Sequence, residues 1–159
     1  MLLYFTAWNT VDCSAAKHSP TSHEYMQQKG NRKMSQGFNH FDENGNAVMV
    51  DVSAKNITPR TAVATGEIHV GPIIMAAVQE GSVKKGDVLG VARVAGIMGV
   101  KRTSDLIPMC HPLPIQKCSI DYELEPEKGI IRVFCTVKTE GKTGVEMEAL
   151  TGVQVTLLT

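Results

Sequence analysis

Three prolines within seven residues, Pro108, Pro112 and Pro114, constrain the centre of this sequence more than any other feature. Proline fixes its own φ and disfavours helix in the residue before it, so a stiff, extended loop is predicted there. The loop carries Cys110, a possible soft nucleophile or ligand, and His111, which can change charge near neutral pH. It is therefore the first candidate for chemistry. The alternative is a buried loop that merely contains both residues, and the loop alone favours this second interpretation.

A glycine-containing helix is predicted just before the loop. Asp87 has the side chain of an N-cap, and the helix is expected to run from about Val88 to Thr103. Gly90, Gly96 and Gly99 would weaken such a helix in isolation. They are understandable if another element packs closely against it, so the helix is predicted to be central and buried.

Four basic residues, Lys84, Lys85, Lys101 and Arg102, lie near the ends of the elements that flank His111. Together they could bind an anion such as a phosphate chain. Two simpler explanations stay open. Cations in the last turn of a helix favour its dipole, and runs of charge are most often solvated surface.

The other predicted elements indicate an α+β fold with antiparallel pairing. Alternating apolar and polar residues predict a β-hairpin, and a proline followed later by a glycine predicts a short helix. In order, the sequence predicts a turn at 41–46, strands at 47–52 and 61–70, a helix at 73–81, and hairpin strands at 117–124 and 130–139.

Glu146 and Glu148 follow the Gly141–Gly144 turn and are candidates for acid–base chemistry. Thr143 and Glu146 have the spacing of a capping box, which would explain Glu146 without any function. In a helix, two positions two apart point away from each other, so the two glutamates are a weak signal as a pair.

The composition bounds the function classes. A chain of 159 residues has room for one domain, and 16 basic residues balance 16 acidic ones, so nothing calls for nucleic acid or an anionic membrane as a partner. The four cysteines lack CxxC spacing, which argues against a zinc ribbon or a disulfide framework. Reduced thiols in a cytoplasmic protein fit best.

The two ends of the sequence carry separate expectations. Residues 1–33 open with an apolar run too short to span a membrane and turn polar without periodicity, so they are predicted to be an extension without regular structure. The domain is placed at 34–159. At Thr159 an apolar helix stops without the usual C-terminal signals, which suggests a C-terminally incomplete domain.

From about Met34 onward the sequence resembles the MoaC family of molybdenum cofactor biosynthesis proteins, with matching segments in the same order and spacing. The Ile-Pro-Met-Cys-His-Pro loop and the Gly-Val-Glu-Met-Glu-Ala-Leu-Thr segment are specific enough that chance is a poor explanation. The matching segments are 50–55, 85–88, 95–97 with 101–103, 105–113 and 141–151.

The resemblance implies a ferredoxin-like α+β fold and a lyase activity. Family members rearrange a cyclised dihydro-GTP, supplied by a radical SAM enzyme, to cyclic pyranopterin monophosphate and release diphosphate. No metal or organic cofactor is expected, and the family assembles as a homohexamer, a trimer of dimers, with the site shared between subunits. By position, the catalytic residues would be Lys85, His111, Glu146 and Glu148. The substrate-binding residues would be Met109, Cys110, His111, Met147, Glu148, Lys55, Lys101 and Arg102.

The family pattern continues beyond the point at which this sequence ends. It adds a Tyr-Asp-Met-Cys-Lys segment, whose Asp and Lys belong to the family site, and then a last strand. The sheet here is therefore expected to lack its last strand. Two functional hypotheses follow: a synthase of this pathway, or an inactive fragment that binds a pterin-like nucleotide or joins oligomers of an intact synthase.

Overall fold

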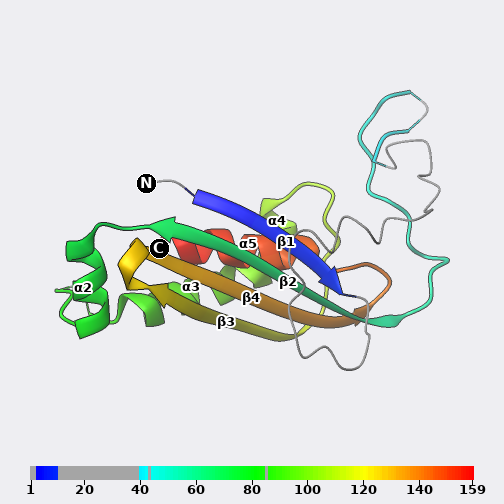
Figure 1. Cartoon of the computed structure of the whole chain (residues 1–159). Helices are drawn as coiled ribbons and strands as arrows, with labels where there is room; N and C mark the ends of the chain where they lie inside the picture. Colours follow the sequence, from blue (N-terminus) through cyan, green and yellow to red (C-terminus); the bar gives the residue numbers. More distant parts are fainter. Residues whose placement is uncertain (1–2, 11–39, 43, 85) are drawn as a thin grey trace, which may run out of the picture.

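The computed structural model describes residues 3–10, 40–42, 44–84 and 86–159. Within these ranges it forms one antiparallel sheet with helices packed on one of its faces (Figure 1). The elements in chain order are β1 (Leu3–Thr10), β2 (Thr58–His69), α2 (Pro72–Glu80), α3 (Val88–Lys101), α4 (Thr103–Leu106), β3 (Ile115–Glu125), the 3-10 turn η1 (Pro126–Lys128), β4 (Ile130–Gly141) and α5 (Glu146–Leu158).

The strands lie in the order β1-β2-β4-β3, and every neighbouring pair is antiparallel. The chain passes from β2 through α3 to β3, and β4 lies in the sheet between these two strands. This split arrangement is the one expected of a ferredoxin-like fold. The predicted α+β class, antiparallel sheet and hairpin are confirmed, with the hairpin strands a few residues longer than predicted.

The core lies between the sheet and the two long helices. Along β4 the side chains of Val133, Cys135 and Val137 are buried, as the alternating pattern predicted, and they share one hydrophobic cluster with Ala149 and Val153 of α5. Burial of these aliphatic groups is the main stabilising contribution to the fold. It also fixes the orientation of α5, whose first turn reaches the candidate site.

Helices α3 and α5 approach each other closely through small residues. A Cβ added at Gly96 would collide with the hydroxyl of Thr156, and one added at Gly99 would lie 2.8 Å from Cγ2 of Val155. The prediction of a glycine-containing helix packed against another element is confirmed at these two positions. Asp87 also caps α3 as predicted, because its carboxylate accepts a hydrogen bond from the backbone of Gly90 at 2.8 Å.

The predicted strand at 47–52 is wrong. One isolated bridge joins Phe41 to Ala47, and residues 48–52 run beside the candidate pocket without joining the sheet. The predicted turn before it is held by the carboxylate of Asp42, which accepts hydrogen bonds from the backbone N–H groups of Asn44 and Asn46. After this turn the N–H of Val48 donates to the carbonyl of His40, and the carbonyl of Val50 is bonded to the His111 side chain. The backbone of 48–50 therefore meets partners other than a strand of the sheet.

The first strand differs from the expectation for residues 1–33. Leu3–Thr10 forms β1 and pairs antiparallel with β2, from Leu3 opposite Ile68 to Thr10 opposite Thr61. This strand lies beside β2 at the edge of the sheet and is the fourth strand of the order β1-β2-β4-β3 (Figure 1). The rest of the predicted extension lies outside the described residues. Among the helices of the described ranges, none combines the length and the apolar character that a membrane crossing requires.

Candidate active site

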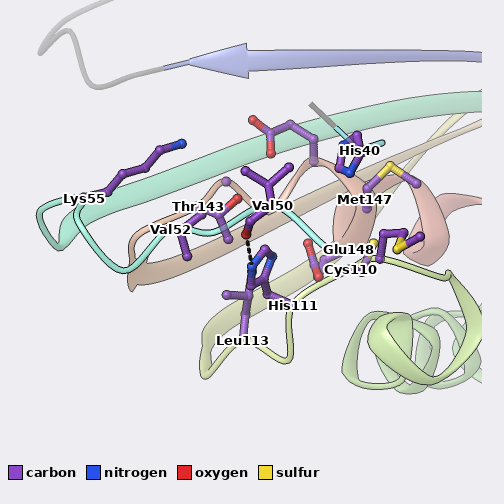
Figure 2. Close-up of a pocket in the computed structure, with 13 residues that line it drawn as sticks. His40, Val50, Val52, Lys55, Cys110, His111, Leu113, Thr143, Met147 and Glu148 are labelled. Carbon is purple, nitrogen blue, oxygen red and sulfur yellow. Dashed lines mark hydrogen bonds between the residues drawn. The ribbon is translucent and has the colours of Figure 1, made fainter. Parts of the chain in front are cut away.

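One pocket of about 330 Å³ gathers most of the candidate residues (Figure 2). Three parts of the chain form it: residues 40–55, the proline-rich loop, and the turn that leads from β4 into α5. Its lining residues are His40, Val50, Val52, Lys55, Met109, Cys110, His111, Leu113, Thr143, Gly144, Glu146, Met147 and Glu148.

The proline-rich loop reaches the pocket through an ordered end of α3. The buried hydroxyl of Thr103 donates to the carbonyl of Val100 at 3.1 Å, and the short helix α4 follows. Met109 then adopts φ 68°, a left-handed conformation that is uncommon for a residue other than glycine. The turn directs Cys110 and His111 into the pocket. The predicted loop is confirmed, although α3 ends at Lys101.

The imidazole of His111 is held by the backbone of a distant segment. Its Nε2 lies 3.0 Å from the carbonyl oxygen of Val50, and the contact is partly buried (Figure 2). A carbonyl oxygen only accepts, so Nε2 must donate its proton. In neutral His111, Nδ1 then keeps its lone pair and can accept a proton.

The two glutamates lie in the first turn of α5. Val145 is the N-cap and makes no side-chain capping bond, so the predicted capping box from Thr143 is wrong. The carboxylate of Glu146 instead folds back over Gly144, where a Cβ would collide with it. Both glutamates line the pocket because it lies at the end of the helix, not along its side. Helical spacing separates two such residues on the side of a helix, but at the end of a helix both can reach the same pocket.

The glutamate side chains differ in burial. Glu148 is only 4% exposed, and this burial raises its pKa, with the charge of Glu146 acting in the same direction. Its own backbone N–H opposes the shift. A carboxyl group with a raised pKa can exchange protons closer to neutral pH than an ordinary glutamate can.

Burial, and then the charge of Glu148, raises the pKa of Cys110. At neutral pH Cys110 is therefore a thiol and not a thiolate nucleophile. This environment disfavours both roles suggested by the sequence, since a nucleophile and a metal ligand both require the thiolate, and it leaves Cys110 as a neutral group of the pocket wall. The pocket thus combines a proton acceptor on His111, a thiol, and a carboxyl group whose protonation is easily changed.

Lys55 lies at one end of the pocket (Figure 2). The carboxylate of Asp51 accepts a hydrogen bond from the backbone of Ser53 at 2.8 Å, which forms a turn just before Lys55. The ammonium group of Lys142 donates to the carbonyl of Ser53 at 2.6 Å and ties this turn to the end of β4. The ammonium group of Lys55 is therefore carried on a braced loop.

The other predicted cations do not gather at this pocket. Lys84, Lys101 and Arg102 are exposed and are not among its lining residues, and Lys85 lies outside the described residues. Lys101 lies near Cys118 of β3, whose pKa is lowered by a hydrogen bond from Cys135 and further by the Lys101 charge. Within the described part of one chain, the predicted cluster of cations is not assembled around His111.

Sequence reasoning missed several lining residues, of which His40 and Val50 bear most on the chemistry. Val50 contributes a backbone carbonyl, and no side-chain pattern reveals such a role. His40 directly precedes the turn cluster at 41–46. That position was the available signal, because polar residues beside a fixed turn are common in binding sites.

Comparison with known proteins shows which family the chain resembles. The MoaC family model matches residues 49–159. A cyclic pyranopterin monophosphate synthase of Clostridium botulinum is 59% identical over 126 residues, which cover 79% of each chain. Proteins of the same name from Pelobacter propionicus and Cereibacter sphaeroides are each 58% identical, over 77% of this chain and 76% and 77% of their own lengths. The chain belongs to the MoaC family.

Proposed function

We propose that this chain is a cyclic pyranopterin monophosphate synthase, a lyase that rearranges a cyclised dihydro-GTP to cyclic pyranopterin monophosphate and releases diphosphate. The observation that carries the proposal is that two family segments far apart in sequence, 109–111 and 146–148, line the same pocket. The names of relatives that are 54–59% identical agree with it.

The pocket has groups suited to this rearrangement. Opening the guanine-derived ring and closing the pterin ring both require proton transfers, which the free Nδ1 of His111 and the carboxyl of Glu148 can perform. Forming the cyclic phosphate breaks the bond that holds the outer two phosphates. Cations beside the triphosphate would stabilise the negative charge that develops on the departing diphosphate.

We assign the individual roles as proposals. His111, Glu146 and Glu148 would transfer protons, together with Lys85, while Met109, Cys110 and Met147 would contact the substrate. Lys55 would meet the phosphates at its end of the pocket. Lys101 and Arg102 are also proposed to contact the substrate. Because they do not line the pocket of their own chain, they can do so only from elsewhere.

Such contacts require a second copy of the chain. Among the described lining residues, Lys55 provides a positive charge while Glu146 and Glu148 carry carboxyl groups, a poor match to a triphosphate. Lys101 and Arg102 of another subunit would correct this imbalance. We therefore propose a homo-oligomer with shared sites, a hexamer built as a trimer of dimers. We also propose a cytoplasmic location, a substrate delivered by a radical SAM enzyme, and a family domain at 34–159 to whose sheet β1 adds an edge strand.

Subunit mixing tests the shared site. A chain with Lys101→Ala and Arg102→Ala and a chain with His111→Ala are each expected to be inactive. Mixed after mild dissociation, they should recover part of the wild-type rate, since some sites combine two intact halves. Recovery no greater than the sum of the separate chains would place each complete site within one subunit.

The competing function is binding without catalysis, as in a fragment that holds a pterin-like nucleotide or joins oligomers of an intact synthase. Product analysis separates the two. Incubation of the purified chain with the cyclised dihydro-GTP should yield cyclic pyranopterin monophosphate and diphosphate, identified by mass spectrometry. Saturable binding of the substrate with neither product would favour the competing function.

A further inference from the structure

His40 lines the candidate pocket but lies before residues 49–159, the part that the family model matches. It belongs to a short, folded-back segment. The backbone N–H of Val48 donates to the carbonyl of His40 at 2.9 Å, and Phe41 bridges Ala47. The backbone of His40 is therefore fixed beside the pocket although its side chain is exposed.

Asp42 is the centre of this turn. Its carboxylate accepts from the backbone of Asn44 at 2.9 Å and of Asn46 at 2.8 Å, and from the Asn46 amide at 3.1 Å. The hydrogen bonds from Asn46 hold the pKa of Asp42 below its usual range. The turn is thus maintained by contacts that do not involve the imidazole of His40.

The same segment also positions the other histidine of the pocket. Val50, eight residues after Asp42, accepts the hydrogen bond from His111. One short stretch therefore places an imidazole at the rim and holds a second one inside. The segment therefore contributes to the site in two ways, through the His40 side chain and through the Val50 carbonyl that holds His111.

The pocket has two chemically different ends. In Figure 2 Lys55 lies at one end, while His40 and Met147 lie at the other, with Cys110 and Glu148 nearby. An anionic phosphate chain is attracted to the ammonium of Lys55 and repelled by the carboxylate of Glu148. The ring portion of such a substrate is left to the end that holds His40.

We propose that His40 is a further substrate-binding residue, whose imidazole packs with the thioether of Met147 against the guanine-derived ring. The inference rests on the proposed function for the identity of the ring. Met147 is 40% exposed and lines the pocket, so part of its side chain is available to a ligand. A flat imidazole and a polarisable thioether both suit the face of a heteroaromatic ring.

Binding to substrate fragments tests the proposal without requiring turnover. The probes are GTP, guanosine and inorganic tripolyphosphate, with affinities measured by calorimetry. His40→Ala should weaken GTP and guanosine by a similar factor, roughly tenfold as for loss of a stacking side chain, and leave tripolyphosphate unchanged. Lys55→Ala should show the opposite selectivity.

Further variants separate packing from hydrogen bonding and from fold. His40→Phe, which keeps a flat ring, should retain more guanosine affinity than His40→Gln, which keeps a hydrogen-bonding group. Asp42→Ala should weaken guanosine binding by freeing the turn. His69→Gln, at the far end of β2, is the matched control and should bind every probe as the wild type does.

The outcomes are distinguishable from those of the proposed function. Unchanged guanosine affinity in His40→Ala, or an equal loss for tripolyphosphate, would overturn the assignment of His40 to the ring. Retention by His40→Gln with loss in His40→Phe would overturn the packing role. A wild-type chain that binds guanosine through His40 but forms no product would refute the synthase and leave the His40 assignment standing.

Discussion

His111 donates a hydrogen bond from Nε2 to the backbone carbonyl of Val50, with 3.0 Å between the two atoms. The bond connects the proline-rich loop to a segment 61 residues earlier in the chain. Because the acceptor is a carbonyl, it selects one neutral tautomer of His111 and leaves Nδ1 as the proton acceptor. The orientation of this base is therefore set by main chain, which no side-chain substitution at position 50 removes directly.

The tautomer itself can be observed. In ¹⁵N-labelled protein with a neutral His111 ring, NMR should show the hydrogen on Nε2 and a lone pair on Nδ1. His111→Ala identifies the signal by its disappearance. A hydrogen found on Nδ1 in the neutral ring would mean that the contact with Val50 does not persist in solution.

The left-handed turn at Met109 predicts unequal effects of two substitutions. Met109→Val should destabilise the fold by about 1–3 kcal/mol, since a β-branched residue is strained at positive φ. Met109→Gly should change stability by less than about 1 kcal/mol, because glycine accepts that conformation but loses more entropy on folding. Urea unfolding measures both. Equal destabilisation by the two variants would show that the turn is not left-handed in solution.

Burial of Glu148 predicts a stability that depends on pH. Its pKa is higher in the folded chain than in the unfolded chain, so folding favours the protonated form. The contribution of Glu148 to stability is therefore most favourable below the ordinary glutamate pKa and declines as pH rises through the folded pKa.

Glu148→Gln removes this dependence. At neutral pH the variant should be more stable than the wild type, by about 0.5–2 kcal/mol as is common for single stabilising changes, and much less active. The difference should shrink towards pH 4, a result that thermal unfolding across pH can check. A gap that widened on acidification would reverse the direction assigned to this pKa.

The close contact between α3 and α5 predicts that adding one methyl group at Gly96 lowers the stability of the fold. Gly96→Ala should destabilise the fold by about 1–3 kcal/mol, because the new Cβ would meet the Thr156 hydroxyl and lie 3.0 Å from the Gly152 carbonyl. Gly71→Ala is the control, since no atom lies within 4 Å of its added Cβ. If Gly96→Ala matched that control in chemical denaturation, the two helices would not be packed this closely.

Patterns with one dominant cause predicted the fold well. Alternation in 130–139 reflects a strand with one buried face, and Val133, Cys135 and Val137 are indeed buried. Glycines in a helix require a close neighbour, and α5 provides it at Gly96 and Gly99. In both cases the local sequence and the tertiary packing favour the same structure.

Predictions failed where another interaction competed with the pattern. The apolar run at 47–52 does not become a strand, because the N–H of Val48 bonds to the His40 carbonyl and the carbonyl of Val50 bonds to the His111 side chain. The spacing of Thr143 and Glu146 suggested a capping box, but the Glu146 carboxylate folds over Gly144 instead. Spacing alone does not decide which of several nearby groups a side chain will meet.

The candidate site was predicted in part. The family segments identified His111, Cys110 and Glu148, and these line one pocket. Position along the chain did not reveal that Lys101 lies towards Cys118 and away from that pocket. Proximity to the end of a helix does not give the direction of a side chain, which depends on the rotation of the helix against its neighbours.

Single-turnover product formation tests the central claim, that the pocket around His111 carries out the synthase reaction. Wild-type chain in excess over the cyclised dihydro-GTP should form cyclic pyranopterin monophosphate and diphosphate in equal amounts. His111→Ala should still bind the substrate, and its rate should fall by about 10²–10⁴-fold, the usual worth of a general base. Product formation by His111→Ala at the wild-type rate would contradict the account.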